Sequence, residues 1–300
     1  MTQSSMPFVA LVTSFDADEE IDYAAVRKQV RRQVDAGNNI LCCGTNGDFS
    51  SLLFEEKVKL SAEVLSAAKG EQKVFVNVGA PSTYETLKLS KEISALGVDA
   101  LAVITPYFIA CTQEGLYRHY CQIADAVEVP VYLYDIPART QNHIEPETAR
   151  RLADHGNIAG IKDSGGTQKT LDEYLAISRE NPNFDVYSGP DSLVLYALKN
   201  GAKGCVSGLA NTNSVLIKQI CDAFDAGDMA TAEKAQAAFT ELRADLYGFG
   251  YPPAMVKRAL YLMDNSVGAS RQPALIPDTK LDVQITEVLK KHGLLETKGA

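Results

Sequence analysis

The amino-acid sequence predicts a closed (β/α)8 barrel that is followed by a helical region. Eight times in succession, a short apolar segment typical of a buried strand precedes an amphipathic segment typical of a helix. The connections between these segments are short, and such regular alternation indicates an all-parallel sheet. The eight repeats occupy residues 1–228, which agrees with the roughly 200–250 residues that a barrel of this type needs.

An open, doubly wound sheet is the alternative fold. That fold usually has fewer strands, and its first strand is followed by a glycine-rich nucleotide-binding turn. The corresponding turn here reads Ser14-Phe15-Asp16 and contains no glycine. The number of repeats and the residues of this turn therefore both favour the barrel.

The strands are expected where four to six apolar residues, many of them β-branched, lie between polar or glycine-containing segments. In chain order these segments are Phe8–Thr13, Ile40–Cys43, Val74–Val78, Ala100–Ile104, Val131–Ile136, Ile158–Lys162, Phe184–Ser188 and Gly204–Ser207. Helices are expected where apolar residues recur at helical spacing after each strand, and the first of them ends at Gly37. The expected helices are Asp22–Ala36, Leu52–Ala68, Thr83–Leu96, Gln113–Val127, Glu145–His155, Thr170–Arg179, Leu193–Asn200 and Ser214–Ala226.

After about Asp228 the alternation stops, and three further helices are expected at Met229–Leu246, Pro253–Met263 and Leu281–Leu295. The first of these carries an apolar stripe at helical spacing. Its members are Ala232, Ala235, Phe239, Leu242 and Leu246. We expect residues 229–300 to form a helical region packed on the barrel, either as a structural cap or as a source of subunit contacts.

The composition limits the possible partners. The chain has a formal net charge of −9, whereas proteins that bind nucleic acids or anionic membranes favour basic surfaces. The six cysteines form neither a CxxC motif nor a cluster with histidine, so we expect reduced thiols in a cytoplasmic protein and no metal site. No apolar run is long enough to span a bilayer.

The most informative residue is Lys162, which comes near the end of the apolar strand Ile158–Lys162. A lysine removed from water loses its proton more easily, and a neutral amine can attack a ketone to form a Schiff base. In a (β/α)8 barrel, this end of the strand faces the active site. The alternative interpretation is a strand-end lysine paired with Asp163 or another carboxylate.

Other polar residues follow the remaining strands. A turn is expected after the second strand, at Gly44-Thr45-Asn46-Gly47-Asp48. Its N–H groups and its threonine hydroxyl can hold a carboxylate. An ordinary turn, in which Ser50 or Ser51 caps the next helix, fits the sequence equally. Tyr134 can relay a proton, or it can be a core aromatic residue.

Arg139 can bind a carboxylate with two hydrogen bonds, or it can be a surface charge. Asp191, Val206 and Ser207 end strands seven and eight, where polar groups can contact a substrate.

Taken together, these residues resemble the pyruvate-dependent class I lyase family that includes dihydrodipicolinate synthase, N-acetylneuraminate lyase and 2-keto-3-deoxy sugar-acid aldolases. The resemblance covers nearly the whole chain, and the matching segments occur in the family's order and at its spacing. They are Gly44–Asp48, Thr105–Tyr107, Tyr134–Thr140 and Gly160–Asp163.

The resemblance implies a mechanism without metal or cofactor. Lys162 condenses with the ketone of pyruvate or another 2-keto acid, and Tyr134 relays protons. Thr45 positions Tyr134 and, with Asn46 and Gly44, seats the carboxylate. Arg139, Asp191, Val206 and Ser207 contact the rest of the substrate. The partners implied are pyruvate, an aldehyde and three further copies of the chain, in a homotetramer built as a dimer of dimers.

Two departures from the synthases bear on the substrate. Asn46 replaces the second hydroxylated residue of their Gly-Thr-Thr-Gly turn, and Phe108 replaces a tyrosine that reaches a neighbouring subunit's site. We therefore expect a lyase that acts on a 2-keto-3-deoxy sugar acid or a similar hydroxylated 2-keto acid. Dihydrodipicolinate synthase is the main alternative, and Arg139 favours it. Dehydratase and neuraminate lyase activities are two further alternatives. The non-enzyme alternative is a sensor barrel that binds 2-keto acids.

Overall fold

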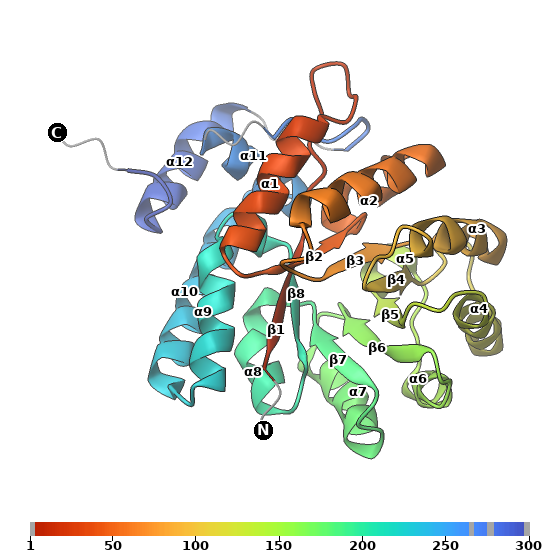
Figure 1. The fold of residues 1–300 in the computed structure, drawn as a ribbon. Helices are drawn as coiled ribbons and strands as arrows, with labels where there is room; N and C mark the ends of the chain where they lie inside the picture. The colour runs from red at the N-terminus through yellow and green to blue at the C-terminus, as the bar shows by residue number, and fades with distance from the viewer. Residues whose placement is uncertain (1–3, 264–266, 275–278, 297–300) are drawn as a thin grey trace.

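The computed structural model contains a closed barrel of eight parallel strands in sequential order, which confirms the predicted fold class (Figure 1). The structure describes residues 4–263, 267–274 and 279–296. The strands are β1 (Met6–Ala10), β2 (Asn39–Cys42), β3 (Val74–Asn77), β4 (Ala100–Ile104), β5 (Val131–Asp135), β6 (Ile158–Asp163), β7 (Asp185–Ser188) and β8 (Gly204–Ser207).

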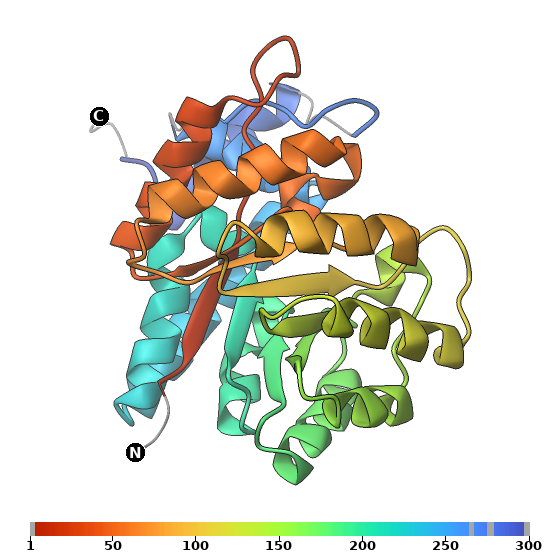
Figure 2. The same cartoon turned by 45° about the vertical axis from the view of Figure 1, so that its right-hand side comes forward.

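A ring of helices surrounds the strands (Figure 2). After the barrel strands come α1 (Tyr23–Asp35), α2 (Phe54–Ala68), α3 (Thr83–Ser94), α4 (Gln113–Asp125), α5 (Pro137–Thr140), α6 (Pro146–Ala153), α7 (Gln168–Glu180), α8 (Val194–Lys199) and α9 (Ser214–Asp225). Side chains cap several of these helices at the N-terminus, where the first N–H groups have no partner within the helix. The carboxylate of Asp22, for example, accepts a hydrogen bond from the N–H of Ala25 at 2.9 Å.

The boundaries differ from the expected ones at identifiable points. The first strand runs from Met6 to Ala10 and not from Phe8 to Thr13, because Met6 pairs with Gly204 of β8 and closes the barrel. The prediction that Ser50 or Ser51 caps α2 is wrong: Leu53 is the N-cap residue, and its N–H donates to the carboxylate of Glu56 at 2.7 Å. The short helix α5 was not expected.

The half of the barrel nearer the strand N-termini is filled by side chains. Phe8, Phe75, Tyr132 and Tyr187 point inward from four strands and are all buried. The rings of Phe75 and Tyr132 stack with centroids 5.0 Å apart, and those of Phe8 and Phe75 lie 4.4 Å apart. Since offset and tilted aromatic pairs pack densely, this layer fills the barrel interior, and a ligand can reach Lys162 only from the strand C-termini.

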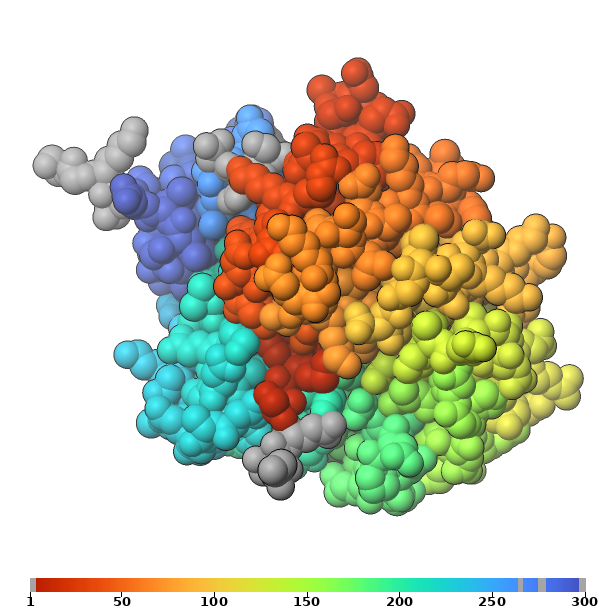
Figure 3. Space-filling view, in the orientation of Figure 1, coloured from red at the N-terminus to blue at the C-terminus, as the bar shows by residue number. Residues whose placement is uncertain are grey.

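The C-terminal helices are α10 (Met229–Tyr247), α11 (Pro252–Leu262) and α12 (Asp282–Lys291). The five residues of the predicted apolar stripe on α10 are all buried, and α10 packs along α9 (Figure 1). In the space-filling view, the C-terminal helices lie beside α1 and α2 on one face (Figure 3). The predicted end of this region at residue 300 lies outside the described residues, and its role as a separate domain stays a prediction.

A buried ion pair fixes α11 to the turn after β2. The ammonium group of Lys257 contacts the carboxylate of Asp48, and both side chains are less than a tenth exposed. The hydroxyl of Ser270 donates to the same carboxylate at 3.0 Å, and the ring of Phe15 lies 4.6 Å from the lysine nitrogen. Burial lowers the pKa of Lys257, and the charge of Asp48 opposes this effect.

Two further features of the described residues concern membrane-spanning helices and disulfide bonds. No helix in the described parts of the chain is both long and apolar enough to cross a membrane. All six cysteines are unpaired.

Substitution of Lys257 tests how strongly this ion pair holds the C-terminal helices. We expect Lys257→Met to lower the free energy of unfolding by about 3–5 kcal/mol, because it leaves the buried carboxylate of Asp48 without a counter-charge. The double variant Lys257→Met/Asp48→Asn should recover much of the loss, because no buried charge remains. Urea unfolding measures both.

Lys199→Met, which removes one partner of an exposed ion pair with Glu233, is the control and should lower the free energy of unfolding by about 1 kcal/mol or less. A loss below 1 kcal/mol for Lys257→Met would contradict the expectation.

Candidate active site

An open pocket of about 220 Å³ lies at the C-terminal ends of the strands. It is lined by residues in or shortly after β2, β5, β6, β7 and β8, by residues of α10 and by the first residues of α11. Barrel enzymes act at this end of the strands. Of the residues expected from the sequence, seven line this pocket: Thr45, Asn46, Tyr134, Arg139, Lys162, Asp191 and Val206.

Lys162 and Tyr134 are neighbours because their strands pair in register. Tyr134 of β5 lies opposite Lys162 of β6, and the lysine nitrogen is 3.9 Å from the centroid of the tyrosine ring. Lys162 is 6% exposed and Tyr134 is 1% exposed. The amine therefore combines shelter from bulk water with access to the pocket.

A bulge in β6 sets this register. Val131 pairs with Ile158 and Tyr132 pairs with Gly160, so Ala159 has no partner on β5. Without the extra residue, Tyr134 would pair with Ile161, and Lys162 would be displaced by one position relative to β5. Gly160 is required at the bulge because a Cβ atom there would lie 2.1 Å from the carbonyl oxygen of Asp185.

The hydroxyl of Tyr134 is also tied to the turn after β2. It lies 2.9 Å from the hydroxyl of Thr45, and either oxygen can be the donor. A phenol in contact with a second hydroxyl can accept a proton and pass it on. The amine of β6, the phenol of β5 and the threonine hydroxyl of the turn after β2 thus lie together.

Thr45 and Asn46 begin a short 3-10 turn, Thr45–Gly47. As its first residues, they present N–H groups that have no acceptor within the turn. The side chain of Asn46 packs against Gly208, where a Cβ atom would lie 2.5 Å from its amide nitrogen. Gly44 is buried behind the turn and does not line the pocket.

Asp191 and Ser207 form a buried pair on one side of the pocket. The hydroxyl of Ser207 donates to a carboxylate oxygen of Asp191 and accepts the N–H of Ala210 at 3.0 Å. Burial raises the pKa of Asp191 to about 6, while Ser207 and the positive charges of Arg243 and Lys162 act in the opposite direction. Ser207 therefore contributes to the pocket through Asp191 and does not line it.

The alternative interpretation of Lys162, an ion pair with Asp163, does not hold. Successive residues of a strand point to opposite faces, and Asp163 points away from the barrel interior. Its carboxylate accepts hydrogen bonds from the N–H of Gly165 at 2.7 Å and the hydroxyl of Thr170 at 3.2 Å. Burial raises the pKa of Asp163 to about 6.

Arg139 follows β5 on helix α5 and is exposed. Its guanidinium lies 4.9 Å from the centroid of the Tyr251 ring, which orients it by cation–π attraction.

The sequence analysis missed several lining residues. Arg243 and Tyr247 come from α10, and Pro252 and Pro253 begin α11. The helical stripe on α10 identified its buried face but gave no indication that the neighbouring Arg243 reaches the end of the barrel. Ser164, directly after β6, was also missed.

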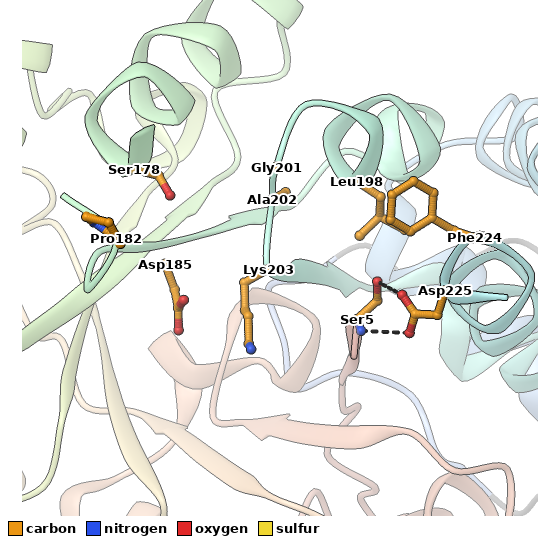
Figure 4. A pocket seen from close by; sticks show the side chains of 10 residues that line it. All are labelled: Ser5, Ser178, Pro182, Asp185, Leu198, Gly201, Ala202, Lys203, Phe224 and Asp225. Atoms are coloured by element: carbon orange, nitrogen blue, oxygen red, sulfur yellow. Dashed lines mark hydrogen bonds between the residues drawn. The ribbon is translucent and has the colours of Figure 1, made fainter. Parts of the chain in front are cut away.

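A second cavity, of about 430 Å³, lies at the opposite end of the barrel. Figure 4 shows Asp185 and Lys203, which precede or begin the last two strands, beside Ser5. The N–H and hydroxyl of Ser5 donate to both carboxylate oxygens of Asp225. None of the expected site residues lies here, and in barrel enzymes this end serves stability. Within the described residues, no group of three or more His, Cys, Asp or Glu side chains could hold a metal ion.

Comparison with known proteins agrees with this geometry. Residues 3–292 match the model of the dihydrodipicolinate synthetase family. A 4-hydroxy-tetrahydrodipicolinate synthase from Trichlorobacter lovleyi is 35% identical over 96% of this chain and 98% of its own. The enzyme of the same name from Alcanivorax borkumensis is also 35% identical, over 97% and 98% of the two chains.

Solved structures give the same result. The dihydrodipicolinate synthase from Acinetobacter baumannii, solved with pyruvate, superimposes with a TM-score of 0.91 at 32% identity and covers 98% of this chain and 100% of its own. A prophage protein of the family from E. coli K12, also in complex with pyruvate, gives a TM-score of 0.93 at 26% identity over 98% and 100% of the chains. This chain therefore belongs to the dihydrodipicolinate synthetase family of pyruvate-dependent class I lyases.

Proposed function

We propose that the protein is an aldolase that forms a Schiff base between Lys162 and pyruvate and joins the resulting enamine to an aldehyde, or runs the reverse cleavage. One observation carries the proposal: the buried amine of Lys162 lies against Tyr134, whose hydroxyl is bonded to Thr45. This arrangement supplies a nucleophile and a proton relay within one pocket.

In the first half of the reaction, the nitrogen of Lys162 bonds to C2 of pyruvate. The ketone oxygen takes up two protons, with Tyr134 as the relay, and leaves as water to give an iminium ion. The iminium withdraws electrons from C3, so that a proton leaves C3 and an enamine forms. The walls of the pocket keep bulk water from the amine before this step.

In the second half, C3 of the enamine attacks the carbonyl carbon of the aldehyde. A new carbon–carbon bond forms, and the aldehyde oxygen takes a proton from Tyr134 to become a hydroxyl. Water then hydrolyses the iminium and frees Lys162. The hydrolysis also releases one proton, which returns to Tyr134 through Thr45, whose hydroxyl is 2.9 Å from that of Tyr134.

The carboxylate of pyruvate is seated at the turn after β2. The N–H groups of Thr45 and Asn46, which begin the 3-10 turn and have no acceptor within it, support this placement, and Gly44 precedes them. Asp191, supported by Ser207, and the backbone of Val206 contact the rest of the bound keto acid.

Two substrates are the leading candidates. Arg139 favours an aldehyde that carries its own carboxylate, such as aspartate semialdehyde, and the names of the relatives favour a 4-hydroxy-tetrahydrodipicolinate synthase. Phe108 favours a lyase of 2-keto-3-deoxy sugar acids, because this residue is 94% exposed and has no hydroxyl to relay a proton. The carboxylate of Asp191, which Ser207 holds in place, can accept hydrogen bonds from sugar hydroxyls and also favours the lyase.

The same proposal includes a homotetramer in the cytoplasm. Four large apolar side chains at the start of α2 and α3 and in the connection before α4 are more than half exposed in the single chain: Leu53, Tyr84, Phe108 and Ile109. Apolar residues grouped in this way are typical of subunit contacts.

Reductive trapping tests the proposal. We expect sodium borohydride with pyruvate to inactivate the protein and to add the mass of reduced pyruvate to Lys162, because borohydride reduces the iminium to a stable amine. Peptide mass spectrometry locates the label. Borohydride without pyruvate is the control. Labelling of another lysine, or no labelling, would refute the mechanism and would favour a barrel that only binds 2-keto acids.

Tyr134→Phe tests the proton relay. We expect kcat to fall by about 10²–10⁴-fold, the usual contribution of a positioned acid–base group, while the KM for pyruvate changes little. Tyr132→Phe is the matched control, because Tyr132 lies two residues earlier on β5 and its hydroxyl bonds to Asp185 at 3.0 Å, away from the pocket. Equal effects on kcat and KM would make Tyr134 a packing residue.

A substrate panel separates the two candidates. If the protein is a synthase, pyruvate consumption should depend on aspartate semialdehyde; if it is a sugar-acid lyase, pyruvate should appear from a 2-keto-3-deoxy sugar acid. The measurement is the kcat/KM of each reaction, and a ratio above about 100 assigns the substrate. Pyruvate release from neither sugar acids nor other hydroxylated keto acids would exclude the lyase.

A further inference from the structure

Two arginines line the pocket, and tyrosines of one short segment orient both. The guanidinium of Arg139 lies 4.9 Å from the ring centroid of Tyr251, and that of Arg243 lies 5.4 Å from the ring centroid of Tyr247. The two tyrosines are four residues apart: Tyr247 ends α10 and Tyr251 directly precedes α11. They orient guanidinium groups that come from α5 and α10 and that line the same pocket.

Neither guanidinium forms an ion pair with a carboxylate of the described residues. Other arginines of the chain do so: Arg31, Arg150, Arg258 and Arg271 contact Asp35, Glu180, Asp282 and Glu56. Cation–π stacking fixes the direction of a guanidinium and leaves its N–H groups available, since the ring occupies only its face. The N–H groups of both guanidiniums are therefore available to bind the anionic group of a ligand.

The charge balance of the pocket leads to the same conclusion. Lys162, Arg139 and Arg243 line it together with a single carboxylate, that of Asp191. The whole chain has a formal net charge of −9, so this concentration of positive groups is local. Pyruvate brings one carboxylate, which the turn at Thr45 and Asn46 accommodates. The two arginines remain for a second acidic group.

We propose that Arg243 is a specificity-determining residue that acts with Arg139 to hold a distal carboxylate on the substrate. The inference rests on the proposed Schiff-base function and adds to it the substrate class: the longer keto acid that is cleaved at Lys162, or formed there from pyruvate and an aldehyde, is a dicarboxylate. One carboxylate lies next to the ketone, and the other lies at the far end of the chain, between the two guanidinium groups.

A different role for Arg243 would be to act as the counter-charge of Asp191, whose pKa it lowers. The two roles predict different results. A counter-charge affects the binding of all keto acids alike, because Asp191 lies in the pocket whichever substrate is present. A residue that binds the distal carboxylate affects only those keto acids that carry one.

The test compares keto acids that differ only in the distal group. The pairs are 2-oxopimelate with 2-oxoheptanoate and 2-oxoadipate with 2-oxohexanoate, in which a methyl group replaces the distal carboxylate. Borohydride trapping at Lys162, followed by mass spectrometry of the intact protein, gives the half-saturating concentration of each acid. We expect the wild-type protein to prefer the dicarboxylate of at least one pair by about 10- to 100-fold, the usual contribution of charge-assisted hydrogen bonds.

In Arg243→Gln, this preference should fall at least 10-fold, and Arg243→Lys should restore part of it, because lysine keeps the charge but not the paired N–H groups. Arg118→Gln, on the exposed side of α4, removes the same charge far from the pocket and should keep the preference. Thermal melting checks that each variant is folded.

The outcomes separate this inference from the proposed function. If pyruvate is not trapped on Lys162 of the wild-type protein, the Schiff-base function itself is wrong. If pyruvate is trapped equally well in wild type and Arg243→Gln, but the wild type shows no preference for dicarboxylates or the variant keeps it, the function stands and the role of Arg243 is refuted. An equal loss for both members of a pair assigns Arg243 to Asp191 instead.

Discussion

The register between β5 and β6 places the amine of Lys162 against the ring of Tyr134, and the rest of the site depends on it. Because Ala159 is an unpaired extra residue, each later residue of β6 is displaced by one position relative to β5. The same displacement pairs Asp135 with Asp163 on the outer face. There, the carboxylate of Asp135 accepts hydrogen bonds from His143 at 2.8 Å and Tyr174 at 3.1 Å. These contacts stabilise the end of β5 on the side that faces the helices.

The pocket is confined from two sides. Below it, the aromatic layer of Phe8, Phe75, Tyr132 and Tyr187 fills the barrel, so a ligand cannot pass beyond Lys162. Beside it, α10 and the start of α11 supply side chains that no barrel strand carries. The buried ion pair of Lys257 with Asp48 joins α11 to the turn after β2 that contains Thr45. The C-terminal helices and the barrel thus build one site.

Charge is distributed unevenly over the protein. A chain with a formal net charge of −9 repels anions at long range, but three positive side chains line the pocket with one carboxylate. A concave site with low-dielectric walls strengthens the local field. An anion is therefore attracted only close to the pocket, and this attraction increases with the number of its negative charges.

The sequence by itself determined the barrel and the lysine at its centre. Eight apolar segments that alternate with amphipathic ones allow few other folds, and Gly37 and Asp22 mark the ends of α1 as expected. Polar residues that follow successive strands also had to meet at one end, because parallel strands end at the same side. Only the tertiary structure decided the register, since one unpaired residue in β6 cannot be recognised from its apolar composition. It also decided which distant residues join the site: Arg243 is one polar position on an amphipathic helix, and its approach to the pocket follows from how α10 packs on α9.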